Sequence, residues 1–170
     1  MKKILVILIT GLIYNSVFNH GNAQLIGGKN NINVPDVGLN SKIGVKISKA
    51  DFRSLKTFSK YYKNASDVKW FSEPGCITAR FSGNQINTTV LFDKQGRWIR
   101  TTKTYQEDKM EPGIRAIVKS KYYDHKINLV KEVNEGGMLC YFIYLENDKN
   151  YTIVTLYEGE VSIYENFQKS

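Results

Sequence analysis

Few side chains of this sequence have both the type and the spacing that catalysis needs. The chain has two histidines, and His125 alone remains once the N-terminal segment described below is removed. A metal site built on two imidazoles is therefore excluded, and a Ser-His-Asp or Cys-His arrangement would depend on His125. Because a cation near the end of a helix is favourable by itself, we interpret His125 in Tyr123-Asp124-His125-Lys126 as a solvated helix-end residue.

Sequence motifs for other chemistry are missing as well. No Gly-rich phosphate loop, GxSxG elbow or calcium-loop pattern occurs, and the sequence predicts no cofactor and no metal. The run Asp93-Lys94-Gln95-Gly96 has the composition of a hairpin connection in which the glycine supplies a positive φ, and we prefer this to a cation site. Paired carboxylates can hydrolyse glycosides, but their separation is not readable from a sequence. A small exported hydrolase using carboxylates or His125 is therefore the alternative reading.

The two cysteines, Cys76 and Cys140, are the remaining reactive side chains. Each opens or lies within the second strand of one of the two units described below. In an exported protein two thiols raise the question of a disulfide, but free buried cysteines are also common. Both readings stay open at this point.

The N-terminus predicts export. Lys2 and Lys3 precede an apolar run from Ile4 to Tyr14, and small and polar residues follow up to Ala23. This is the pattern of a secretory signal peptide over residues 1–23. The run is shorter than the ~20 residues of a membrane-spanning helix, and no cysteine lies near the cleavage point to accept a lipid. We expect a periplasmic or secreted protein without a stable membrane anchor.

Charge gives a weaker indication of the partner. The chain carries 24 Lys and Arg against 16 Asp and Glu, a net charge of +8. Removing residues 1–23 takes away two lysines and no acid, which leaves 22 against 16, or +6. Such a charge favours an acidic partner. Export argues against nucleic acid, so we expect another exported or envelope protein.

Local patterns predict the elements that must position any site. Residues 24–49 have no sustained period and form an extended lead-in. A helix follows, in which Phe52, Leu55, Phe58 and Tyr62 share one face. Pro112 opens a second helix. Alternation and turn signals predict four strands after each helix, those of the first half being 68–72, 76–81, 86–92 and 97–105.

The two halves resemble copies of one unit. The offset between matching residues grows from 61 at the helix ends to 62 and then 63 along the strands, as single insertions would produce. The matches are Ser59-Lys60-Tyr61-Tyr62 with Ser120-Lys121-Tyr122-Tyr123, Val68-Lys69 with Val130-Lys131, Glu73 and Gly75 with Glu135 and Gly137, and Asn87, Thr89 and Gly96 with Asn150, Thr152 and Gly159. We expect repeats over residues 50–106 and 107–170.

One family resemblance rests on the helix ending in Tyr61-Tyr62, on Val68-Lys69-Trp70, and on the hairpin run from Val90 to Trp98. In these features the chain resembles the β-lactamase-inhibitor-like, PepSY-like proteins exported by Bacteroidetes. The second half departs from the hairpin pattern, with Glu158-Gly159-Glu160 at its turn. The resemblance implies α+β repeats with helices on one sheet face, and a binding or inhibitory role without catalysis.

Together these observations predict an α+β fold of two repeated α-β-β-β-β units. Their antiparallel meanders either merge into one broad sheet or remain as paired sheets, with helices packed on one face. The opposite face would then expose aromatic side chains, as protein-binding surfaces do. The strand residues that we expect to bind a partner there are Trp70, Trp98, Arg100, Tyr141, Tyr144 and Tyr157. Some of them can instead be core, because aromatic residues favour strands in general.

Overall fold

The computed structural model describes residues 49–170, so the predicted signal peptide and the lead-in up to residue 48 lie outside the described residues. Two helices, a short 3-10 helix and eight strands follow one another along the chain. They are α1 (Lys49–Tyr61), β1 (Lys69–Glu73), β2 (Cys76–Gly83), β3 (Ile86–Asp93), β4 (Trp98–Tyr105), η1 (Glu107–Lys109), α2 (Pro112–Lys121), β5 (Lys126–Glu135), β6 (Met138–Glu146), β7 (Asn150–Tyr157) and β8 (Glu160–Gln168).

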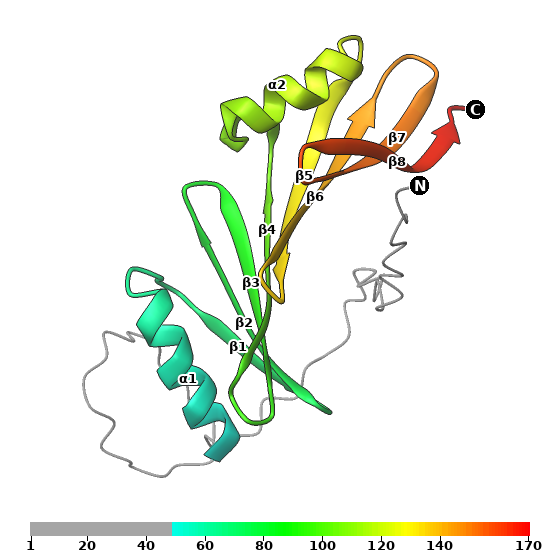
Figure 1. The fold of residues 1–170 in the computed structure, drawn as a ribbon. Helices are drawn as coiled ribbons and strands as arrows, with labels where there is room; N and C mark the ends of the chain where they lie inside the picture. Colours follow the sequence, from blue (N-terminus) through cyan, green and yellow to red (C-terminus); the bar gives the residue numbers. More distant parts are fainter. Residues whose placement is uncertain (1–48) are drawn as a thin grey trace, which may run out of the picture.

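All eight strands belong to one sheet, in the order β1 to β8. Every strand pairs antiparallel with its neighbour in the sequence, including β4 with β5 across η1 and α2. Of the two arrangements that we considered, the single merged sheet is the one formed. The α+β class is confirmed, and the sheet is twisted with both helices on the same side (Figure 1). That the two halves are repeats stays a prediction.

The turn between β3 and β4 is built as its sequence predicts. Gly96 has a φ of +76°, and Asp93 Oδ1 accepts hydrogen bonds from the backbone N–H groups of Gln95 and Arg97, each at 2.9 Å. The Arg97 side chain closes the turn on Asp93 Oδ2 at 2.6 Å. The Asp93 carboxylate is therefore occupied by two backbone N–H groups and by the Arg97 guanidinium group of the same turn.

The second helix also begins where its sequence predicts. Pro112 is its first residue, where the missing N–H of proline does no harm. The Glu111 carboxylate accepts hydrogen bonds from Gly113 N at 2.9 Å and Ile114 N at 2.8 Å. These two backbone donors hold the pKa of Glu111 below its ordinary value.

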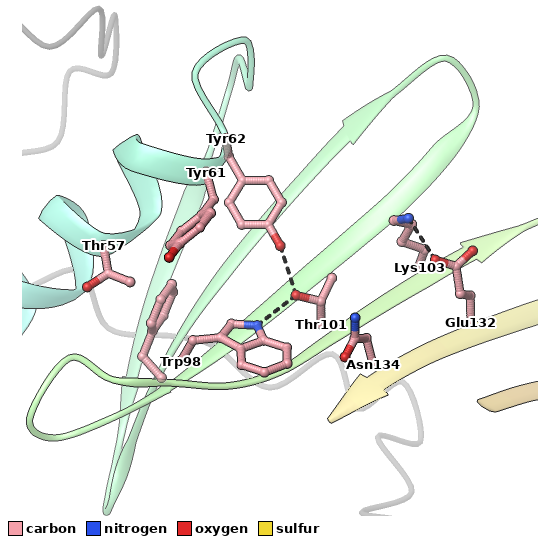
Figure 2. Close-up of a pocket in the computed structure, with 9 residues that line it drawn as sticks. Thr57, Tyr61, Tyr62, Trp98, Thr101, Lys103, Glu132 and Asn134 are labelled. Atoms are coloured by element: carbon pink, nitrogen blue, oxygen red, sulfur yellow. Dashed lines mark hydrogen bonds and ion pairs between the residues drawn. The ribbon is translucent and has the colours of Figure 1, made fainter. Parts of the chain in front are cut away.

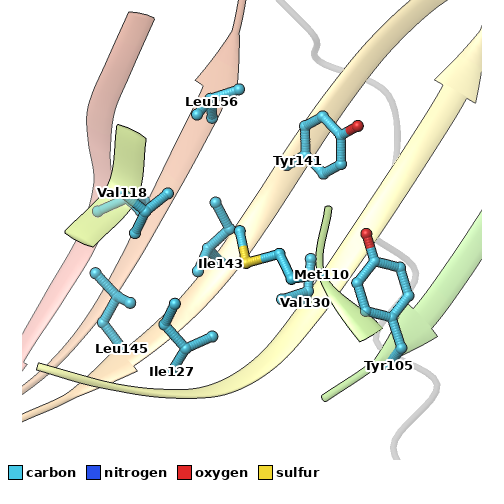
Figure 3. Close-up of a cluster of buried hydrophobic side chains, with 10 residues drawn as sticks. Tyr105, Met110, Val118, Ile127, Val130, Tyr141, Ile143, Leu145 and Leu156 are labelled. Atoms are coloured by element: carbon cyan, nitrogen blue, oxygen red, sulfur yellow. The ribbon is translucent and has the colours of Figure 1, made fainter. Parts of the chain in front are cut away.

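Strand register assigns both hydrophobic cores to one face of the sheet, here called the helix face. Directly paired residues share a face, and the pairs Ile77–Phe92, Val90–Thr101 and Tyr105–Val130 connect one core to the other along this face. The core under α1 consists of Phe58, Val68, Ile77, Ala79, Val90 and Phe92. The core under α2 consists of Tyr105, Met110, Val118, Ile127, Val130, Tyr141, Ile143, Leu145, Val154 and Leu156 (Figure 3).

The first helix uses a narrower buried stripe than its pattern predicts. Phe58 is 3% exposed and Ser54 is fully buried, whereas Phe52 is 50% exposed. Ser54 and Phe58 are four residues apart and so lie one above the other on the helix. The stripe runs through this pair because the β3–β4 turn lies against Arg53 and Ser54, and Phe52 is left outside it.

Candidate functional site

The sheet face opposite the helices, here called the open face, carries its aromatic side chains in its C-terminal half. Phe142 and Tyr144 come from β6, Tyr151 and Tyr157 from β7, and Tyr164 and Phe167 from β8. The outermost three are the most accessible: Tyr151 is 48%, Tyr164 47% and Phe167 50% exposed. By contrast, the first four strands contribute mainly threonines and charged residues to this face, with Phe71 the exposed aromatic there.

Ring contacts hold four of these aromatic side chains in place. Phe142 and Tyr164 meet edge to face, with ring centroids 5.6 Å apart. The Lys131 ammonium group lies 5.1 Å from the centroid of Tyr144, and Lys169 lies 4.7 Å from that of Tyr151. The open face is thus a prearranged surface of aromatic rings with lysines beside them.

Three of the six predicted binding residues lie on the open face. Arg100 pairs in register with Glu135, and its guanidinium group is 3.5 Å from the Glu135 carboxylate. Tyr144 and Tyr157 are half-buried members of the aromatic group. A hydrogen bond to Glu158 raises the pKa of Tyr157, so this side chain keeps its hydroxyl proton at neutral pH.

The other three predicted residues, Trp70, Trp98 and Tyr141, lie on the helix face, so the expectation that all six share the uncovered face is wrong. Trp70 pairs with Ala79 and packs edge to face on Phe58 at 5.2 Å. Tyr141 is 9% exposed within the second core. The reason is register: a shift of one residue along a strand moves a side chain to the opposite face.

Trp98 lies in a pocket of about 470 Å³ on the helix face, between the C-terminal end of α1 and strands β4 and β5 (Figure 2). Its indole N–H donates to Thr101 Oγ1 at 2.9 Å, and the Tyr62 hydroxyl lies 2.8 Å from the same oxygen. Lys103 and Glu132 face each other at the other end, with Nζ and Oε1 2.7 Å apart. The pocket therefore has an aromatic end under α1 and a polar end over the central strands.

A half-buried carboxylate and two buried phenol groups continue from this polar end into the second core. The Tyr105 hydroxyl donates to Glu132 Oε2 at 3.1 Å. Burial, and then the nearby Glu132 charge, raise the pKa of Tyr105. Burial raises the pKa of Tyr141 for the same reason. Both phenols therefore remain neutral hydrogen-bonding groups, and Glu132 has a partner on each oxygen.

The two cysteines do not form a disulfide. Both thiols are free, and three strands separate β2, which holds Cys76, from β6, which holds Cys140. At the usual spacing of ~4.8 Å between strands, the two positions are roughly 19 Å apart, whereas a disulfide needs Cα atoms within about 7 Å. Merging the two meanders into one sheet therefore keeps the cysteines apart.

His125 is a packed residue and not the solvated helix-end side chain that we expected. Its side chain is 12% exposed and meets Tyr122 edge to face, with ring centroids 5.3 Å apart. Nδ1 lies 2.8 Å from Asp124 Oδ1, and Nε2 lies 3.1 Å from Asn147 Nδ2. Both ring nitrogens thus have partners that tie α2 to the β6–β7 connection.

Within residues 49–170 no group of three or more His, Cys, Asp or Glu side chains is arranged to hold a metal ion. None of the helices in the same range has the length and apolar character to cross a membrane.

Several residues of these surfaces were missed in the sequence. Phe142, Tyr151, Tyr164 and Phe167 belong to the open face, and Asn134 lines the pocket. The alternation in β6 separates Phe142 and Tyr144 from Ile143 and Leu145, which was a usable signal for the aromatic residues. Asn134 has no comparable signal, because only the pairing of β4 with β5 brings it to the pocket.

Comparison with solved structures places this fold among proteins from Bacteroides. A BLIP-like protein from Bacteroides fragilis superposes with a TM-score of 0.56 at 16% identity, over 73% of this chain and 87% of that one. A DUF2874 family protein from Bacteroides ovatus gives 0.54 at 20% identity, over 68% and 85%. A protein from Bacteroides eggerthii, provisionally named as periplasmic, gives 0.53 at 15% identity, over 68% and 86%.

These likenesses confirm the resemblance seen in the sequence at the level of the fold. No protein-family model matches the sequence, and no curated protein matches it either.

Proposed function

We propose that this protein is a non-catalytic module that recognises another exported protein through the aromatic part of its open face. The observation that carries the proposal is the gathering of six aromatic side chains over β6, β7 and β8 on the face without helices. Large aromatic rings on a rigid sheet bury much surface with little loss of side-chain entropy, and such residues supply most of the energy of protein interfaces.

The polar groups around the aromatic rings favour recognition over chemistry. Arg100 and Glu135 pair at the margin of the open face, as rim residues of interfaces do. Away from this face, His125 has partners on both ring nitrogens, and Glu132 on both oxygens. The BLIP-like name of one structural neighbour agrees with the inhibitor-like role that the sequence resemblance implies.

The test compares two variants in capture from an envelope fraction. In the first, Tyr151, Tyr164 and Phe167 are changed to serine; in the second, only Tyr123, which is 83% exposed beyond α2, is changed. We expect that one envelope protein is captured by the wild type and by the Tyr123→Ser variant but not by the triple variant. Equal retention by all three proteins, with folding verified by circular dichroism, would contradict the open face as the binding site.

The location and the partner's charge belong to the same proposal. The protein acts in the periplasm or outside the cell after cleavage near Ala23, and the provisional periplasmic name of one neighbour supports this. N-terminal sequencing of the exported protein should find Gln24 as the first residue, and an intact Met1 would contradict cleavage. With its charge of +6, the mature chain should associate with an acidic partner more slowly as salt rises, while dissociation changes little.

We further infer that residues 50–106 and 107–170 are copies of one α-β-β-β-β unit. The element order, a helix followed by four strands in each half, supports this, as do the positive φ angles of Gly96 and Gly159 in the corresponding hairpins. Superposing residues 50–105 on residues 112–166 should match strand to strand. A mismatch in strand length or register through the whole second half would contradict duplication.

A further inference from the structure

We propose that the pocket under α1 on the helix face is a binding site for a neutral saccharide. This site lies on the opposite side of the sheet from the open face and does not depend on the function proposed above. Its volume of about 470 Å³ is within the ~300–1,000 Å³ range of small-molecule sites. The argument rests on which of its polar groups already have partners and which do not.

The aromatic end offers ring surface to a ligand. Trp98 and Tyr62 have both used their polar atoms on Thr101, so what they present is their rings. Tyr61, the last residue of α1, is 66% exposed and overhangs the opening (Figure 2). The carbon-bound hydrogens on one face of a sugar ring make an apolar surface of the kind that packs on aromatic rings.

The polar end contains one polar atom without a partner. Asn134 Oδ1 is buried and has no hydrogen-bond partner, and the Asn134 side chain lines the pocket. Native proteins leave few such groups unpaired, and each one calls for an explanation, of which a bound water, ion or ligand is one. An amide has two donors and one acceptor, and a sugar hydroxyl, which both donates and accepts, complements it.

The charges of the pocket favour a neutral ligand. Lys103 is paired with Glu132 at 2.7 Å, and the second oxygen of Glu132 accepts from Tyr105. An anionic ligand would have to take Lys103 from this pair, and a cationic ligand would have to take Glu132. A ring that carries hydroxyl groups but no charge leaves the pair in place and still meets Asn134.

The experiment uses the fluorescence of Trp98. The chain has two tryptophans, so Trp70→Phe leaves Trp98 as the single reporter at the site. This protein is titrated with glucose, galactose, N-acetylglucosamine and maltose, and with glucose 6-phosphate and glucosamine as charged probes. We expect a saturable change with at least one neutral sugar, and weaker binding of the charged probes.

Two further variants separate binding from folding. Asn134→Leu, a change of similar volume, should weaken sugar binding by about tenfold, the equivalent of one or two hydrogen bonds. It should leave the urea midpoint unchanged or raised because it removes an unpaired buried oxygen. Tyr123→Ala, at the corresponding end of α2, is the control and should bind as before. The proposal is overturned if no neutral sugar changes the signal up to tens of millimolar, if a charged probe binds more tightly, or if Asn134→Leu binds normally.

Discussion

Two glycines in corresponding hairpins should differ in their tolerance of alanine. Gly96 and Gly159 have φ angles of +76° and +82°, so a side chain at either position is strained by about 1 kcal/mol. Only at Gly96 would the added Cβ meet neighbouring atoms. A Cβ added there would lie 2.7 Å from the Arg53 carbonyl carbon and 2.8 Å from Ser54 N, whereas a Cβ on Gly159 meets nothing within 4 Å.

The extra destabilisation at Gly96 follows from this contact. The atoms in the way are Arg53 Cβ and two backbone atoms of α1. Because none of them is the far end of a flexible side chain, the helix itself has to move, and overpacking of this kind costs about 1–3 kcal/mol. We expect Gly159→Ala to lower the free energy of unfolding by about 1 kcal/mol and Gly96→Ala by about 2–4 kcal/mol. Moving α1 also strains the bond of 2.9 Å from Thr57 Oγ1 to the Gly96 carbonyl.

Urea unfolding of the two variants and the wild type measures the difference. Gly75→Ala is a second control, because Gly75 has a φ of +99° and nothing within 4 Å. If Gly96→Ala falls within about 0.5 kcal/mol of both controls, the spread of ordinary surface changes, then α1 does not rest on this turn and our account of the first core is wrong.

Three further predictions concern the core, pH and the thiols. In urea unfolding, Phe58→Ala should destabilise the protein by about 3–5 kcal/mol. Phe52 lies on the same helix but is half exposed, so Phe52→Ala should change stability by less than about 0.5 kcal/mol, and equal effects would contradict the buried stripe. Hydrogen bonds from two N–H groups at the start of α2 lower the pKa of Glu111 from 4.5, so its contribution to stability is complete above pH 4.5 and is lost as the pH falls through the lowered pKa. The difference in melting temperature between wild type and Glu111→Ala should therefore shrink below pH 4.5, and a constant difference would refute this. Denatured protein without reductant should show both thiols to a thiol reagent, and in the native state Cys140, whose pKa burial raises, should react more slowly than Cys76; a missing thiol in denaturant would indicate a bridge.

The predictions that succeeded rest on signals close together in the sequence. Pro112 starts α2 because proline fits the first turn of a helix, and Gly96 marks its turn because the turn needs a positive φ. What the sequence left open or placed wrongly depends on positions far apart in the chain. Whether the two cysteines pair depends on strand order, which separates Cys76 from Cys140 although each belongs to the second strand of its half.

The assignment of faces is the clearest limit of sequence reasoning here. In β6, aliphatic and aromatic side chains alternate, but Tyr141 belongs to the helix side and Phe142 to the other. Alternation separates two sets without stating which set meets a helix, and that choice is made by packing against α2. The pocket is even harder to predict from the sequence, because Tyr61, Trp98 and Asn134 come from three elements that only the β4–β5 pairing brings together.

The polar strip between the two cores has a consequence for how the protein opens. Backbone pairing joins all eight strands into one sheet, but on the helix face Thr101, Lys103, Glu132 and Asn134 divide one hydrophobic cluster from the other. Contiguous regions with their own apolar contacts tend to open as cooperative units. We therefore expect native-state amide exchange to resolve two foldons, one around Phe92 and one around Ile143, with the β4–β5 seam between them acting as a hinge along which the sheet adjusts its curvature.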